Sequence, residues 1–166
     1  MRTRLILYML FITFFQLTSF AQYSAKKMAE FKALSKGADV ILTGKVAKQK
    51  SEWNADKTRI LTHVTIEVDD YLKAANYQKD IVVTHLGGEV GSVGELYTHV
   101  PSFKNNEEVL LFLKKDNLNR AYKVVDGEDG KWSIYKDDKT GEKITSSFVK
   151  ISALKKEIKN YVKQSK

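Results

Sequence analysis

Residues 60–68 read ILTHVTIEV, and all the apolar side chains except Leu61 fall on alternate positions. On an extended strand one face would carry Ile60, Thr62, Val64, Ile66 and Val68, and the other Leu61, His63, Thr65, Glu67 and Asp69. A period of two is typical of a strand with one buried and one wet face, as in an antiparallel sheet. The sequence therefore predicts a β-protein built around this strand.

Other short strands are expected on both sides of this one. Apolar or alternating runs predict strands over residues 38–46, 81–86, 95–100, 109–113, 120–125 and 131–135, with a connection over residues 51–57. Gly44, inside the first run, predicts a bulge or bend. Strands do not alternate with long helical segments, which argues against a parallel sheet. We expect a mainly β fold, a small closed barrel or a sandwich.

A short helix is predicted at each end of the folded part. Residues 23–36 place Ala25, Met28, Phe31 and Leu34 at helical spacing. Ser152 is expected to cap a final amphipathic helix over residues 152–164. Its inward side chains would be Leu154, Ile158, Tyr161 and Val162.

The first 21 residues have the pattern of an export signal. Arg2 and Arg4 precede the apolar residues 5–15, and Ser19 and Ala21 place small residues at the −3 and −1 positions of a cleavage site. Residues 22–166 would then be one domain, with a barrel core over about 38–135. We expect an exported protein, periplasmic or extracellular, that is soluble after cleavage.

Charge and cysteine content limit the classes of partner and of covalent structure. The 166 residues include no cysteine, so no disulfide framework is expected despite the oxidising destination. The net charge is +8, and lysines are frequent near both ends. Such lysines favour weak contact with anionic surfaces, although a solvated helix face explains them more simply.

Four of the nine glycines fall in one run, THLGGEVGSVGE, residues 84–95. Such a cluster is typical of a bulged turn between strands, and it also suits a binding loop. The run matches no phosphate-binding glycine motif, and its two glutamates would repel a phosphate. As a contact surface we predict Gly87, Gly88, Glu89, Gly91 and Gly94 together with Tyr97 and Trp53.

Several of these segments resemble a known fold family. Residues 38–46, with the long alternating strand that ends in Tyr71-Leu72-Lys73, resemble the netrin-like fold, an OB-type barrel shared with the tissue inhibitors of metalloproteinases. Residues 87–94, 101–103 and 108–113 are similar to a group of uncharacterised secreted bacterial domains. The resemblance spans roughly residues 36–135 and implies fold and export. The inhibitors' amino-terminal cysteine has no counterpart here, so their zinc-chelating mechanism is not expected.

The residues that could support catalysis lack the spacing of known sites. His63, His85 and His99 are the candidate metal ligands, and no pair has a short ligand spacing. Ser92 lacks the context of a nucleophile elbow. We therefore expect a non-enzymatic interaction module without cofactor, binding a protein or polysaccharide and not nucleic acid. Two alternatives stay open: a metal-dependent hydrolase that uses the three histidines, and an envelope-associated protein held by lysine-rich helices.

Overall fold

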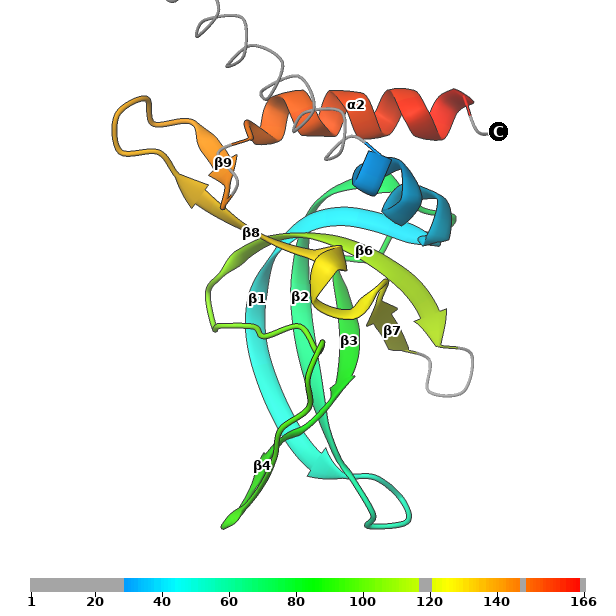
Figure 1. Ribbon diagram of the computed structural model, residues 1–166, viewed down its shortest axis with the longest axis vertical. Coiled ribbons are helices and arrows are strands. Elements are labelled where there is room, and N and C mark those ends of the chain that lie inside the picture. The colour runs from blue at the N-terminus through cyan, green and yellow to red at the C-terminus, as the bar shows by residue number, and fades with distance from the viewer. Residues whose placement is uncertain (1–28, 117–120, 147–148, 165–166) are drawn as a thin grey trace, which may run out of the picture. The chain divides into compact units, whose positions relative to one another are not determined.

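The computed structural model describes residues 29–116, 121–146 and 149–164 (Figure 1). The chain divides into two units, Met1–Ala33 and Leu34–Lys166. Of the first unit, residues 29–33 are described and are helical, and the helical segment runs on to residue 37. The predicted signal peptide and the start of the predicted helix over residues 23–36 lie outside the described residues.

The alternating stretch forms the middle of a long hairpin. β1 (Val40–Trp53) pairs antiparallel with β2 (Ile60–Lys73), and β2 pairs antiparallel with β3 (Asp80–Leu86). Ile60, Thr62, Val64 and Ile66 are buried, whereas the residues between them are half-buried. The predicted one-sided burial of this strand is confirmed.

Five strands pair in a closed ring. β6 (Glu108–Asp116) pairs with β1 on one side and with β7 (Ala121–Val124) on the other, and β7 meets β3 in parallel through Val83 and Tyr122. The order around the ring is β1-β2-β3-β7-β6, and β8 (Lys131–Lys136) and β9 (Lys143–Thr145) continue the sheet from β6. The predicted mainly β class is confirmed.

Buried aliphatic side chains from the ring strands make up the core. Leu42, Val46, Val64, Val83 and Leu111 are each fully buried and belong to one cluster. The pairing register of β1 and β2 shifts between Thr43 and Gly44, which confirms the predicted bulge. A Cβ on Gly44 would collide with the carbonyl oxygen of Glu67. The two backbones can therefore approach closely here because Gly44 has no side chain.

Two predictions about strands and turns are wrong, and one strand was missed. β1 continues to Trp53, so residues 51–53 are strand, and the turn begins at Asn54, whose Oδ1 accepts hydrogen bonds from the amides of Thr58 and Arg59. The expected strand over residues 95–100 is absent, because β5 (Val93–Glu95) ends where that strand was to begin. β9 was not predicted.

The final helix, α2 (Ile151–Gln164), begins one residue earlier than predicted. Ser152 is exposed within the first turn and is not the cap, and Ile151 joins Leu154 and Ile158 as a buried residue. Asp70 of β2 forms ion pairs with Lys155 and Lys159 at 3.2 and 3.3 Å. In the part of the chain that the structure describes, no helix is both long and apolar enough to cross a membrane.

Candidate functional site

The glycine run folds into a small hairpin of its own. β4 (Gly88–Val90) pairs antiparallel with β5, and the chain turns between the paired residues Val90 and Val93. Gly91 has φ +63° in this turn, a conformation that costs a residue with a side chain about 1–2 kcal/mol. The run is therefore a turn between strands, as its composition predicts, with a regular hairpin in place of a bulge.

Gly88 joins this hairpin to the ends of β1 and β2. Its φ is +128°, and a Cβ there would collide with Thr62 Oγ1 and Ser51 Oγ. The Thr62 hydroxyl donates to the carbonyl oxygen of Gly87 at 2.6 Å. Because that bond uses the only hydroxyl proton of Thr62, Ser51 is the donor in the 2.8 Å bond between the two hydroxyls.

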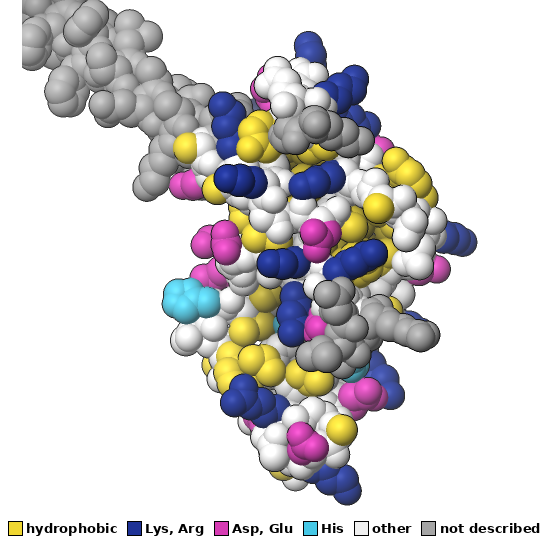
Figure 2. Space-filling model, turned by 90° about the vertical axis from the view of Figure 1, so that its right-hand side faces the viewer, with side chains coloured by type: hydrophobic (Ala, Val, Ile, Leu, Met, Phe, Trp, Pro, Cys, Tyr) yellow, Lys and Arg dark blue, Asp and Glu magenta, His cyan; other side chains and the backbone are white. Residues whose placement is uncertain are grey.

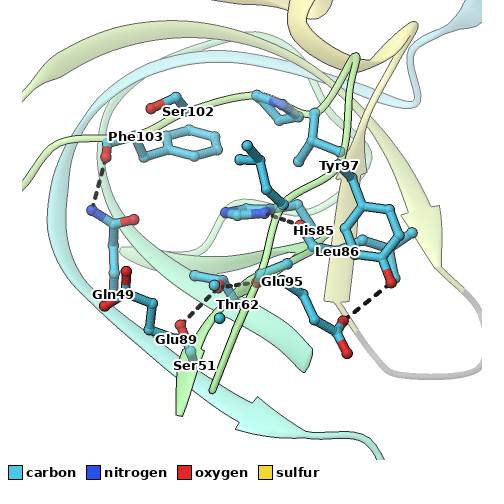
Figure 3. A pocket seen from close by; sticks show the side chains of 16 residues that line it. Gln49, Ser51, Thr62, His85, Leu86, Glu89, Glu95, Tyr97, Ser102 and Phe103 are labelled. Carbon is cyan, nitrogen blue, oxygen red and sulfur yellow. Dashed lines mark hydrogen bonds between the residues drawn. The ribbon is translucent and has the colours of Figure 1, made fainter. Parts of the chain in front are cut away.

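A pocket of about 640 Å³ opens between this hairpin, the neighbouring parts of β1, β2 and β3, and the segment 96–103 (Figure 3). Its apolar wall includes Leu86, Leu96, Tyr97, Pro101 and Phe103. Its polar side chains are Gln49, Ser51, Thr62, His85, Glu89, Glu95 and Ser102. A volume of this size is in the range of small-molecule and side-chain binding sites.

His85 is the most unusual polar group of the pocket. Its Nδ1 lies 2.9 Å from the carbonyl oxygen of Leu86, and since a carbonyl only accepts, Nδ1 carries the proton. Burial lowers the pKa of His85, and it outweighs the hydrogen bond to Leu86, which acts in the opposite direction. The ring is therefore neutral at pH 7. Its Nε2 is buried and has no hydrogen-bond partner among the described residues.

Phe103 holds the His85 ring from one side. The two rings stack with centroids 5.9 Å apart and planes inclined by 21°. The carbonyl oxygen of Phe103 accepts a hydrogen bond from Gln49 Nε2 at 3.1 Å, which ties this segment to β1. Lys131 Nζ lies 5.5 Å from the centroid of Phe103, within the range of a cation–π contact.

A nearly buried ion pair lies behind Phe103. Lys131 Nζ is 2.6 Å from Glu107 Oε1, and their side chains are 11% and 13% exposed. Ser133 also donates to Glu107, and the amide of Lys104 donates to its second oxygen at 3.0 Å. Burial alone would raise the pKa of Glu107, but the hydrogen bonds from Lys131 and Ser133 lower it. This cluster supports the segment that carries Phe103.

Glu95 closes the opposite side of the pocket. Its Oε2 accepts hydrogen bonds from the amide of Ile60 at 2.9 Å and from the Tyr97 hydroxyl at 3.1 Å. Its Oε1 takes part in neither bond. Burial, and then the Glu95 carboxylate, raise the pKa of Tyr97, so this hydroxyl keeps its proton and remains the donor.

The structure brings together five of the seven predicted contact residues. Gly87, Gly88, Glu89, Gly94 and Tyr97 line the pocket. Gly91 lies at the tip of the hairpin, with no atom within 4 Å of the position that its Cβ would take. Trp53 is the last residue of β1, pairs with Ile60 and does not line the pocket.

The three histidines do not gather at one site. His85 is registered opposite Thr62 and His63 opposite Thr84, so the two histidines point to opposite faces of the sheet. His63 Nδ1 lies 3.0 Å from Thr84 Oγ1, and His99 pairs with Glu128 at 3.7 Å. Within the described ranges, no three His, Asp or Glu side chains are grouped so as to hold a metal ion.

Sequence reasoning missed most of the pocket's other lining residues. Gln49 and Ser51 enter it only because β1 continues past Val46, and Pro101, Ser102 and Phe103 enter it from an irregular segment. His85 was singled out, but as a metal ligand.

No protein-family model matches the chain, and no curated protein matches it.

Proposed function

We propose that the chain is a non-enzymatic binding module with an OB/netrin-like barrel, and that the pocket beside the β4–β5 hairpin is its ligand site. Support for the barrel comes from the closed ring of β1, β2, β3, β7 and β6, since the OB fold is a five-stranded Greek-key barrel. In this proposal α2 is the carboxy-terminal helix that accompanies the barrel.

The unpaired Nε2 of His85 is the observation that carries the proposal. Leaving a buried acceptor without a partner costs about 1–3 kcal/mol, and folded proteins keep few such groups. This one belongs to a pocket that combines apolar walls with a few polar groups, the usual composition of a ligand site. A ligand that donates to Nε2 would recover the lost hydrogen bond.

The bonding of the pocket's hydroxyl groups favours binding over acyl transfer. Nucleophilic catalysis needs a hydroxyl within hydrogen-bond reach of a base. The protons of Ser51, Thr62 and Tyr97 are donated to Thr62, to the Gly87 carbonyl and to Glu95, and His85 Nε2 forms no hydrogen bond with these hydroxyls or with that of Ser102. These hydroxyls hold the pocket together and do not act as nucleophiles in our proposal.

The proposed setting is outside the cytoplasm, in the periplasm or beyond the cell. Support comes from the export pattern of residues 1–21. The partner would be a protein or polysaccharide encountered there. Attraction to anionic surfaces is a weaker contribution in this proposal, because two lysines of α2, Lys155 and Lys159, already pair with Asp70.

A ligand panel tests the proposed site directly. The ¹⁵N-labelled protein would be titrated with blocked dipeptides of acidic, basic, aromatic and neutral character and with short oligosaccharides. We expect at least one compound to shift the amides of residues 85–103 saturably. Leu96→Ser should weaken its binding, because Leu96 is 99% exposed beside the pocket, whereas Tyr135→Ser, at an exposed aromatic residue outside it, should not. A panel that shifts no pocket amide would contradict the proposal.

A further inference from the structure

The charge of the pocket is opposite to that of the chain. The protein has 28 Lys and Arg residues against 20 Asp and Glu residues. The residues that line the pocket include Glu89 and Glu95 but no Lys or Arg. Glu89 is exposed and has no hydrogen-bond or ion-pair partner among the described residues. Figure 2 shows one face of the molecule, on which lysine and arginine side chains are spread widely between the acidic ones.

Almost all side-chain donors of the pocket are already used. Gln49 donates to Phe103 and to Asn105, and His85 Nδ1 donates to Leu86. The hydroxyl protons of Ser51, Thr62 and Tyr97 are donated within the lining, as described above. Among the lining side chains, the hydroxyl of Ser102 is the one donor left without a bond.

Apart from the Ser102 hydroxyl, the lining side-chain groups that have no hydrogen bond are acceptors. They are Nε2 of His85, which is buried, the carboxylate of Glu89 and Oε1 of Glu95. An acceptor-rich lining suits a ligand group that only donates. Ammonium and guanidinium are donor-only groups, whereas each sugar hydroxyl both donates and accepts and would leave its acceptors unmatched here.

We propose that this pocket binds an ammonium or guanidinium group carried by a Lys or Arg side chain of a protein partner. The inference rests on the proposed binding function and names the ligand chemistry of that site. The two carboxylates supply the complementary charge, and Tyr97 offers an aromatic face. Val93 on β5 is 46% exposed, and Leu96, which follows β5, is 99% exposed. These two side chains provide apolar contact for the rest of a peptide.

Neither Lys131 nor Arg59 removes this complementarity. Lys131 lies behind Phe103 and is neutralised by Glu107 at 2.6 Å. Arg59 is close enough to lower the pKa of Tyr97, but it is exposed and is not one of the lining residues. A cationic ligand would therefore meet two carboxylates that no Lys or Arg of the lining neutralises.

Calorimetry with matched probes tests the inference. The probes are acetylated and amidated Ala-Arg-Ala and Ala-Lys-Ala, the same peptide with neutral citrulline in place of arginine, and free glucosamine as a non-protein amine. We expect the two cationic peptides to bind and the citrulline peptide to bind about tenfold more weakly, with the difference reduced by salt.

Charge variants locate the effect. Glu89→Gln should weaken the binding of Ala-Arg-Ala about fivefold and leave the affinity for the citrulline peptide unchanged. Glu89 is exposed and supports no other group, so the variant should lose only the charge. Glu157→Gln on α2 removes the same charge away from the pocket and should change neither affinity.

The other possible outcomes contradict either the cation inference or the choice of a protein side chain as the ligand. Equal binding of the arginine and citrulline peptides, or an unchanged affinity in Glu89→Gln, would refute the cation inference. Binding of glucosamine without binding of the peptides would refute a protein side chain as the ligand. If no cationic probe binds while an uncharged panel compound saturates the pocket, the inference fails and the proposed binding function stands.

Discussion

His85 is the residue on which the account of the site depends. Its ring is fixed by stacking on Phe103 and by the bond from Nδ1 to Leu86, and these contacts leave Nε2 as an acceptor. Because the folded protein keeps His85 neutral, the protonation of this residue makes the stability of the protein depend on pH.

The free energy of unfolding should fall in two separate pH windows. Because burial lowers the pKa of His85 below its usual 6.5, the unfolded chain binds a proton there that the folded protein does not bind. Stability should therefore decrease as pH drops below 6.5. Glu107, whose pKa is lowered from 4.5, adds a loss only as the pH falls below that value. Urea unfolding from pH 8 to pH 3 measures both windows.

A His85 variant separates the contribution of His85 to the pH dependence of stability from that of carboxylates such as Glu107. His85→Asn retains a donor near Nδ1 but does not titrate, so its stability should be flat between pH 8 and pH 5 relative to the wild type. An unchanged pH profile in the variant would show that His85 is not the group responsible.

Three glycines of the hairpin should respond differently to alanine. Gly88→Ala should cost about 2–4 kcal/mol, because its Cβ meets Thr62 and Ser51 and its φ is positive. Gly91→Ala should cost about 1–2 kcal/mol for its left-handed φ alone. Gly94→Ala should change the unfolding free energy by less than about 0.5 kcal/mol, since its φ is not positive and its Cβ has room. Equal losses at all three positions would contradict this view of the hairpin.

At the scale of elements, the starts of β6 and β8 support the pocket through side chains that do not line it. Glu107, just before β6, and Lys131, the first residue of β8, form the ion pair that supports Phe103. Removing one partner of such a buried pair leaves an uncompensated charge, which typically costs about 3–5 kcal/mol.

Glu107→Gln and Lys131→Met should therefore each destabilise the fold by about 3–5 kcal/mol, and the double variant should cost less than the sum. Chemical denaturation of the four proteins in a double-mutant cycle measures the coupling. Additive losses would mean that the two side chains act independently. Lys143→Met, which removes a half-exposed partner of Glu108, is the matched control and should cost at most about 1 kcal/mol.

Local patterns predict strands well and their ends poorly. The alternation over residues 60–68 locates β2, and the apolar run 109–113 locates most of β6, because burial of a face leaves a direct signal. The extension of β1 through Ser51 and Trp53 leaves none: its polar residues form strand because they pair with residues 60–62 of β2. Because the sequence does not show that β1 continues past Val46, it also does not identify Gln49 and Ser51 as pocket residues.

At the scale of the whole folded unit, the closed ring creates the site. The register of β2 on β3 places Thr62 and His85 side by side, and the irregular return over residues 96–103 covers them. The sequence predicts a turn at the glycine run and Tyr97 as a contact residue, but not the long-range register that brings Gln49, His85 and Phe103 together. That register depends on ring closure, which has no local signal.

The protonation state of the two ring nitrogens of His85 decides whether Nε2 can accept a hydrogen bond from a ligand. Their ¹⁵N resonances would be recorded at pH 7.5 without ligand and with the panel compound that binds most tightly. We predict a protonated Nδ1 and an unprotonated Nε2 in the free protein, and an upfield shift of Nε2 on binding as it accepts a hydrogen bond. A protonated Nε2 in the free protein, or an Nε2 resonance that does not move at saturation, would contradict the account.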